Sequence, residues 1–210
     1  MTITHGIGVV CGEVIRLIVR GLALSRIHPN VLTFLGLVIN IAGAWLLARG
    51  QFFSAGLVIL AAGLFDMVDG RVARETNRVT RFGAFFDSVI DRYSDLALLI
   101  GLLVWYGTVN RPFYVVLTAL VMAASVMISY TRARAENSIP TCKVGFMERP
   151  ERVGLLIIGA LFDRMAPVLW LIAVLGNLTV VHRMIFTFQE AKRLEEAQLH
   201  SVARRVVGQG

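Results

Sequence analysis

Long apolar runs separated by short charged segments dominate the pattern along this chain. Four runs approach or exceed the length of about 20 residues that a helix needs to cross the hydrocarbon core of a bilayer: residues 31–48, 52–72, 83–106 and 113–131. A fifth stretch, residues 153–183, is interrupted by Asp163, Arg164 and Pro167, and predicts two helices joined by a tight turn. The pattern therefore predicts an all-α integral membrane protein with six transmembrane helices.

The segments outside these runs carry most of the charge. In residues 9–25, Glu13, Arg16 and Arg20 recur at helical spacing among aliphatic residues, which predicts an N-terminal amphipathic helix lying in the membrane interface. Residues 189–210 are charged and leave a short helix and disorder as open alternatives. The predicted organisation is an interfacial helix in residues 1–27, a six-span domain in residues 28–188 and a cytoplasmic tail in residues 189–210.

Composition and charge agree with a membrane location. Hydrophobic residues make up 56% of the 210 residues and charged residues 17%, whereas soluble domains average about 25% charged residues. The net charge of +7 would suggest nucleic acid binding in a soluble protein, but the basic residues lie between the apolar runs, so no nucleic acid partner is expected. They concentrate in the two termini and in the second and fourth loops, which the positive-inside rule assigns to the cytoplasm. The prediction is a multi-pass protein of the cell membrane with its termini and its active site facing the cytoplasm.

Aspartates inside the apolar runs mark the candidate chemistry, because an ionised carboxylate in a membrane span is costly and by default indicates function. Asp66 and Asp69 are spaced i and i+3 near the end of the second run, and Asp87 and Asp91 are spaced i and i+4 near the start of the third. The connecting loop is short, so the two helices are predicted to be antiparallel neighbours. Their acidic ends then meet at the same depth.

Four converging carboxylates predict a site for hard divalent cations, because like charges repel unless they are protonated or bound to metal, and oxygen ligands suit Mg²⁺, Mn²⁺ or Ca²⁺. Two such ions are a recurring device for phosphoryl transfer. Two other interpretations remain open: an ion-paired helix bundle, with arginines such as Arg71 and Arg92 as partners, and a divalent-cation transporter. Asp95, one turn deeper than Asp91, either pairs with Arg92 or handles a proton or the substrate.

The order of these aspartates and small residues resembles a known signature. This order resembles, at every position, the signature of the CDP-alcohol phosphotransferases: Asp66-x2-Asp69-Gly70-x2-Ala73-Arg74-x8-Gly83-x3-Asp87-x3-Asp91. The resemblance implies that two Mg²⁺ or Mn²⁺ ions are held by Asp66, Asp69, Asp87 and Asp91, and that Asp91 is the general base. It also implies a CDP-lipid pocket formed by Pro29, Asn30, Asp66, Asp69, Gly70, Ala73, Arg74, Thr80 and Gly83. For Pro29 and Asn30, a helix start is a sufficient alternative explanation.

Two further segments resemble the phosphatidylinositol phosphate synthase branch of this family. They are residues 129–136 with 144–152, and residues 177–183. The resemblance implies that the phosphate of the acceptor is held by Arg132, Arg152 and Arg183. Bidentate arginine–phosphate pairs suit an anionic acceptor, although each of these arginines also obeys the positive-inside rule. The other basic residues of this region are predicted to serve topology alone: Arg134, Lys143 and Arg149.

Together, these resemblances imply a metal-dependent transfer of a phosphatidyl group from CDP-diacylglycerol to the hydroxyl of a phosphorylated polyol, with release of CMP. Inositol 1-phosphate is the expected acceptor, and phosphatidylinositol phosphate the expected product. Glycerol 3-phosphate is the alternative acceptor, because it is also anionic and would make the protein a phosphatidylglycerophosphate synthase. A homodimer in membrane lipid is also implied by the family.

Overall fold

The computed structural model describes residues 29–75 and 80–207, and their side chains except those of residues 29, 67–75 and 200–207. The predicted interfacial helix in residues 1–27 lies outside this part of the chain. The described residues form helices and connecting loops without a strand, which confirms the all-α prediction. The helices are α2 (Pro29–Ala48), α3 (Phe52–Glu75), α4 (Arg81–Thr108), α5 (Pro112–Ala135), α6 (Arg149–Leu161) and α7 (Met165–Val207).

Helix boundaries fall where the sequence supplies start and stop signals. Thr80 caps α4, because its side chain accepts a hydrogen bond from the backbone N–H of Gly83 at 2.9 Å. Prolines occupy the first turn of α5 and of α6, where the missing N–H has no intrahelical partner to lose. The predicted interruption near residue 163 is a turn between α6 and α7, in which Asp163 has a positive φ of 51°.

Three described helices are long and apolar enough to cross a membrane: Asn30–Ala48, Pro112–Ala135 and Met165–Leu199. The apolar part of α3, Phe52–Asp66, is shorter, and α6 has 13 residues. Many large apolar side chains on the outside of the helices are exposed, including Phe34, Trp45 and Phe113. Because such residues are stable in contact with lipid, these features indicate a membrane protein.

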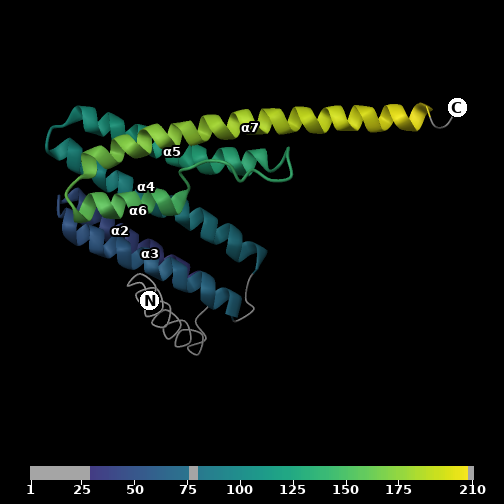
Figure 1. Ribbon diagram of the computed structural model, residues 1–210. Coiled ribbons are helices and arrows are strands. Elements are labelled where there is room, and N and C mark those ends of the chain that lie inside the picture. Colours follow the sequence, from purple (N-terminus) through teal and green to yellow (C-terminus); the bar gives the residue numbers. More distant parts are fainter. Residues whose placement is uncertain (1–28, 76–79, 208–210) are drawn as a thin grey trace, which may run out of the picture.

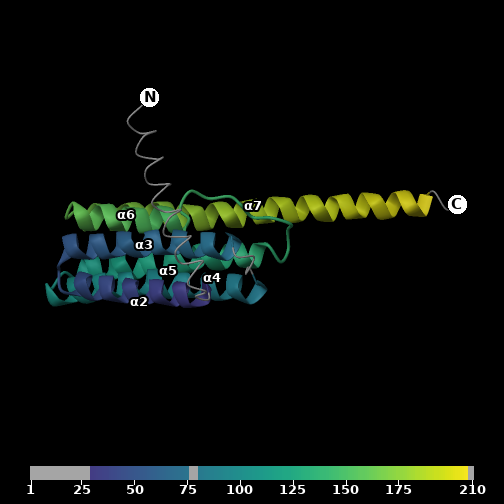
Figure 2. The same cartoon turned by 90° about the horizontal axis from the view of Figure 1, so that it is seen from below.

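The six described helices form a closed ring in which each packs against two others. Going round the ring, α2 contacts α3, α3 contacts α6, α6 contacts α7, α7 contacts α5, α5 contacts α4 and α4 returns to α2. Figure 1 and Figure 2 show these helices running roughly along one direction. The buried core inside the ring comes from all six helices and includes Leu47, Ile59, Leu102, Val121 and Leu169. The carboxyl end of α3 and the amino end of α4, which a short connection joins, therefore lie at the same end of the bundle.

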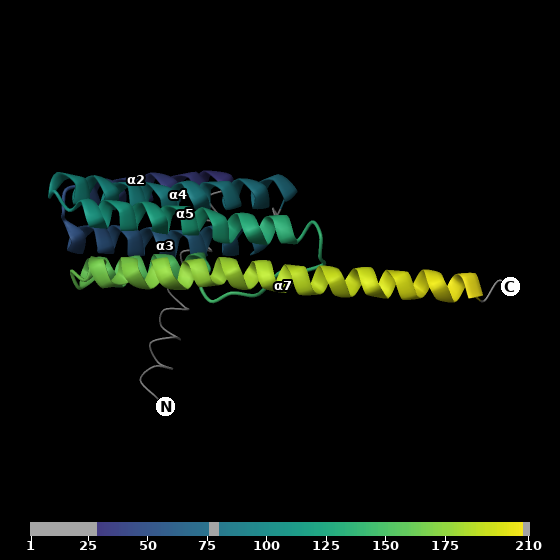
Figure 3. The same cartoon turned by 90° about the horizontal axis from the view of Figure 1, so that it is seen from above.

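Helix α7 continues far beyond the rest of the described bundle, as Figure 1 and Figure 3 show. It runs without interruption through residue 189, where the predicted cytoplasmic tail begins, and ends at Val207. Of the two alternatives for this tail, the structure shows a helix. Its first turns are supported by the α5–α6 connection, since Ala191 and Leu194 pack against a small cluster formed by Ala135, Ile139 and Cys142.

Candidate active site

Carboxylates of α3 and α4 meet at one end of the bundle around a single guanidinium. Asp66 lies on α3, Asp91 and Asp95 lie on α4, and Arg149 is the first residue of α6. Arg149 Nη2 lies 2.8 Å from Asp66 Oδ2, and Arg149 Nη1 lies 3.0 Å from Asp91 Oδ1. Its Nε lies 3.4 Å from Asp95 Oδ1. The predicted convergence of acidic ends is present for Asp66 and Asp91, with an arginine between them.

Helix α2 makes room for this cluster. Gly36 on α2 faces Asp66, and a Cβ added at Gly36 would lie 2.7 Å from Asp66 Oδ1. Any larger residue would push the carboxylate away, because real Cβ atoms do not approach an oxygen so closely. One turn further along α2, the buried Asn40 donates a side-chain hydrogen bond to the carbonyl of Gly36 at 3.0 Å. Asp66 is thus placed by the backbone of a neighbouring helix.

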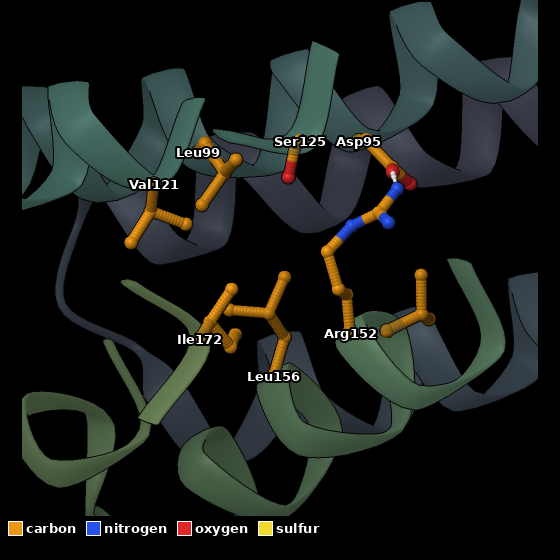
Figure 4. Close-up of a pocket in the computed structure, with 8 residues that line it drawn as sticks. Asp95, Leu99, Val121, Ser125, Arg152, Leu156 and Ile172 are labelled. Atoms are coloured by element: carbon orange, nitrogen blue, oxygen red, sulfur yellow. Dashed lines mark hydrogen bonds and ion pairs between the residues drawn. The ribbon is translucent and has the colours of Figure 1, made fainter. Parts of the chain in front are cut away.

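A second, deeper layer of the site is a buried ion pair between α4 and α6. Arg152 Nη2 lies 2.6 Å from Asp95 Oδ2, and the two side chains are 4% and 8% exposed. Figure 4 shows these side chains pointing toward each other beside Ser125 and a set of aliphatic residues. Arg152 Nη1 also donates to the carbonyl of Met147 at 3.2 Å, whereas its Nε has no hydrogen-bond partner. Asp95 therefore holds two arginines, Arg149 and Arg152.

This pairing corrects two expectations. Asp95 pairs with the arginines of α6, and Arg92, its expected partner, instead donates to the carbonyl of Ser88 on its own helix. Arg149, expected to serve topology alone, contacts three aspartates. Of the two other predicted metal ligands, Asp87 is exposed, and the side chain of Asp69 belongs to the undescribed part. Among the described side chains, no group of three His, Cys, Asp or Glu residues is arranged to hold a metal ion.

Three of the residues predicted to bind the nucleotide lie together at the amino end of α4. A Cβ added at Gly83 would lie 3.0 Å from Thr80 Oγ1 and 3.4 Å from Asn30 Oδ1, so these side chains surround the glycine. Asp87 follows Gly83 by one turn on the same helix. The remaining predicted residues, Pro29, Gly70, Ala73 and Arg74, lie on α2 and α3, and their side chains are outside the described part.

The three predicted acceptor arginines have different surroundings. Arg132 is partly exposed and lies 3.2 Å from Glu136 and 3.4 Å from Glu148. Arg183 is 1% exposed, and its guanidinium donates to Glu148 at 3.0 Å and to two backbone carbonyls, those of Val144 and Ile128. Glu148 thus joins Arg132 to Arg183, while Arg152 belongs to the Asp95 layer.

The loop before α6 is fastened to α7, and this positions Glu148 and Arg149. Thr179 on α7 accepts hydrogen bonds from the backbone N–H groups of Phe146 and Met147 at 3.3 and 3.2 Å. Gly145 has a φ of +118°, a conformation that glycine adopts without strain, and a Cβ there would lie 2.5 Å from Thr179 Cγ2. The loop therefore passes close to α7, and the first residue of α6 lies beside the acidic cluster.

An open cavity of about 390 Å³ extends from Asp66 and Arg149 between α3 and α6. Its remaining lining is almost entirely apolar or small: Asn40, Leu60, Gly63, Leu64, Pro150, Val153, Gly154 and Ile157. One end of this cavity is charged and the rest is suited to hydrocarbon. Such a cavity can hold an amphiphilic molecule whose polar part lies at Asp66 and Arg149.

The similarity of the chain to known proteins agrees with this arrangement. A phosphatidylinositol phosphate synthase of Mycobacterium tuberculosis is 40% identical over 179 residues, which cover 80% of this chain and 82% of that protein. An archaetidylinositol phosphate synthase of Pyrococcus horikoshii is 34% identical over 177 residues, covering 84% of this chain and 90% of that protein.

Solved structures give the same result for the fold. The crystal structure of the M. tuberculosis phosphatidylinositol phosphate synthase with CDP-DAG bound superposes with a TM-score of 0.78 at 36% identity, over 84% of this chain and 94% of that one. The same enzyme in complex with manganese and citrate gives a TM-score of 0.75 at 38% identity, over 81% and 87% of the two chains. The profile of the CDP-alcohol phosphatidyltransferase family matches residues 26–190. The chain therefore belongs to the CDP-alcohol phosphatidyltransferase family.

Proposed function

We propose that this protein transfers a phosphatidyl group from CDP-diacylglycerol to inositol 1-phosphate, giving phosphatidylinositol phosphate and CMP. The observation that carries the proposal is the meeting of Asp66 and Asp91 from two helices around Arg149, with Asp66 and Arg149 forming the charged end of an apolar cavity. Relatives at 40% and 34% identity are named phosphatidylinositol phosphate synthase and archaetidylinositol phosphate synthase, which supports an inositol phosphate as the acceptor. Membership of this family also favours a transferase over a divalent-cation transporter.

The acidic cluster suits two divalent cations, Mg²⁺ or Mn²⁺. Its donors are carboxylate oxygens, which hard cations prefer, and they already gather around one positive group. We assign Asp66, Asp69, Asp87 and Asp91 as the ligands. When bound, such ions would neutralise the pyrophosphate and the charge that develops during transfer. A related structure contains manganese, which supports this choice of metal.

The cavity between α3 and α6 fits the lipid donor. Its apolar walls, such as Leu60, Leu64 and Ile157, would contact the acyl chains, while the diphosphate would lie toward Asp66. The nucleotide would lie against α4 at Gly83, next to Asn30 and Thr80, since the absence of a side chain allows close approach. A related structure binds CDP-DAG, which supports the same donor here.

The acceptor is proposed to enter on the side of α5, α6 and α7. Arg132 is half-buried beside Glu148, and it is the best placed of the three predicted arginines to meet a phosphate from solution. Arg152 and Arg183 are buried and would hold the neighbouring backbone and carboxylates in position, reaching the phosphate only if their present partners rearrange. Asp91 would take the proton of the acceptor hydroxyl, which attacks the phosphorus on the lipid side, and CMP leaves.

The membrane arrangement proposed with this function has six spans, α2 to α7, with residues 28–188 as the catalytic domain. Residues 1–27 would form the interfacial helix, and residues 189–210 a cytoplasmic tail. The acidic end of the bundle and both termini would face the cytoplasm, where CDP-linked substrates and phosphorylated polyols are made available. The homodimer implied by the family stays a prediction.

The test is release of CMP from CDP-diacylglycerol by the purified protein with Mn²⁺ or Mg²⁺, using Asp91→Asn as the blank. Four acceptors are compared: inositol 1-phosphate, glycerol 3-phosphate, inositol and serine. Turnover with inositol 1-phosphate alone is expected. Turnover with glycerol 3-phosphate alone would instead make the protein a phosphatidylglycerophosphate synthase and would contradict the assignment of the acceptor.

A further inference from the structure

Arg149 makes an unusual set of contacts for one side chain. Each of its three guanidinium nitrogens faces a different aspartate: Nη2 faces Asp66, Nη1 faces Asp91 and Nε faces Asp95. These aspartates belong to two helices, and Arg149 belongs to a third, so one cation connects α3, α4 and α6. Its side chain is 26% exposed, which places it at the boundary between the cavity and the buried layer.

The cluster needs a cation. Asp66 and Asp91 have side chains only 24% and 20% exposed, and two partly buried carboxylates held side by side repel each other more strongly than in water. The planar fork of a guanidinium can satisfy carboxylates in several directions at once, which a lysine ammonium does less well. Arg149 supplies that positive charge, since it contacts both Asp66 and Asp91.

A divalent cation and Arg149 would compete for the same two carboxylates, because the positive charges of the metal and the guanidinium repel each other at such short range. Asp66, which accepts a hydrogen bond from Arg149, and Asp91, which forms an ion pair with it, are both assigned above as metal ligands. Asp95 is not among those ligands, and it also holds Arg152. A divalent cation at Asp66 and Asp91 would therefore displace the Nη groups of Arg149, while the contact of its Nε with Asp95 can remain.

We infer that Arg149 is a positioning residue of the metal site, an internal counter-cation that holds Asp66 and Asp91 in place and exchanges with the divalent ions. This inference rests on the proposed function for the identity of the incoming cation. A side chain that contacts the aspartates only when no metal is bound stabilises the metal-free protein alone. Arg149 should therefore raise the stability of the metal-free protein and weaken the apparent affinity of the protein for metal.

The experiment compares wild type with Arg149→Gln and Arg149→Lys in detergent, with and without Mn²⁺. Two quantities are measured: the melting temperature in EDTA and in saturating Mn²⁺, and the Kd for Mn²⁺ from the electron paramagnetic resonance signal of the free ion. Arg134→Gln is the matched control. Arg134 is exposed at the end of α5, so this substitution removes the same charge at a position away from the cluster.

For Arg149→Gln we expect a melting temperature clearly below that of wild type in EDTA and equal to it in Mn²⁺. Its Kd for Mn²⁺ should fall roughly tenfold, a coupling of ordinary size between two competing ligands. Arg149→Lys keeps the charge but lacks the planar guanidinium, so its melting temperature in EDTA and its Kd for Mn²⁺ should lie between those of wild type and Arg149→Gln. Arg134→Gln should match wild type throughout.

Two results would overturn the inference. A melting temperature lowered equally in EDTA and in Mn²⁺ would give Arg149 a permanent structural role, and an unchanged or weaker Mn²⁺ affinity would exclude competition. If Arg149→Gln fails to fold, the same comparison is decided with Arg149→Lys. Wild type that binds no Mn²⁺ would contradict the metal assignment of the proposed function itself, a failure that is distinct from the two above.

Discussion

Replacing Asp95 with asparagine would leave the guanidinium of Arg152 charged, buried and without its carboxylate. The two side chains are 8% and 4% exposed and are joined at 2.6 Å. Arg152 has little else to compensate, because Nη1 donates to one carbonyl and Nε has no partner. Removing one member of a buried ion pair costs about 3–5 kcal/mol, since the remaining charge stays desolvated. The loss of the Arg149 contact at 3.4 Å adds a smaller amount in the same direction.

For a chain of this length, each kcal/mol lowers the melting temperature by roughly 2–4 °C, so Asp95→Asn should melt on the order of 10 °C below wild type. The assay is thermal unfolding of the purified protein in detergent, followed by loss of the monodisperse peak in gel filtration. Asp95→Asn combined with Arg152→Leu should recover most of this loss, because neither charge is then left alone.

Glu196→Gln is the matched control for this comparison. It breaks the ion pair between Glu196 and Lys192 on α7, whose side chains are 61% and 67% exposed and whose atoms are 3.9 Å apart. An exposed pair of this kind contributes less than about 1 kcal/mol, so the melting temperature should hardly change. Asp95→Asn melting within 2 °C of wild type, or a double variant as unstable as the single one, would refute the argument from desolvation.

Three further predictions concern turnover and the metal site. Asp91→Asn should lower kcat by roughly 10²–10⁴, the usual contribution of a general base, and kcat within twofold of wild type would remove it from that role. Arg132→Gln should raise the KM for inositol 1-phosphate about tenfold with little change in the KM for CDP-diacylglycerol, since a charge-assisted hydrogen bond contributes about 1.5–3 kcal/mol, and equal changes would place it elsewhere. Gly36→Ala should weaken Mn²⁺ binding in a direct titration, because its Cβ would lie 2.7 Å from Asp66 Oδ1, whereas Gly63→Ala meets nothing within 4 Å and should bind normally.

The elements of this fold could be predicted because each is determined by local pattern. The apolar runs are long, the interruptions at residues 49–51 and 109–111 are short and each contain two polar residues, and prolines mark the starts of α5 and α6. Even the turn near Asp163 follows from charge and proline within five residues. The continuous helix beyond residue 189 could not be predicted, because the sequence there is polar on most faces and its first turns depend on packing against Ile139 and Cys142.

Prediction of the site was limited by a different factor, the distance between partners along the chain. Asp66 and Asp91 could be placed at one depth from helix spacing and a short loop. Arg149 could not be joined to them, because it is separated from Asp66 by 83 positions and its charge is equally well explained by the positive-inside rule. Arg92 was a natural candidate partner for Asp95 because it lies only three residues away in the sequence. The structure instead pairs Asp95 with Arg152, 57 positions away.

The spacing of four residues along α4 arranges its carboxylates by depth, and their roles should follow. Asp87 is exposed, the side chain of Asp91 is 20% exposed, and that of Asp95 is 8% exposed. A carboxylate that exchanges ligands or protons needs access to solvent, which Asp87 has fully and Asp91 in part. A carboxylate that is buried must keep a permanent cation, because an uncompensated charge at that depth would be expelled or neutralised. In the proposed function, α4 would therefore carry the acids that bind metal and take the proton. A turn deeper it carries Asp95, which contacts Arg149 and Arg152 of α6. Since Arg149 spans both layers, the state of the outer aspartates is coupled to the inner one through a single side chain.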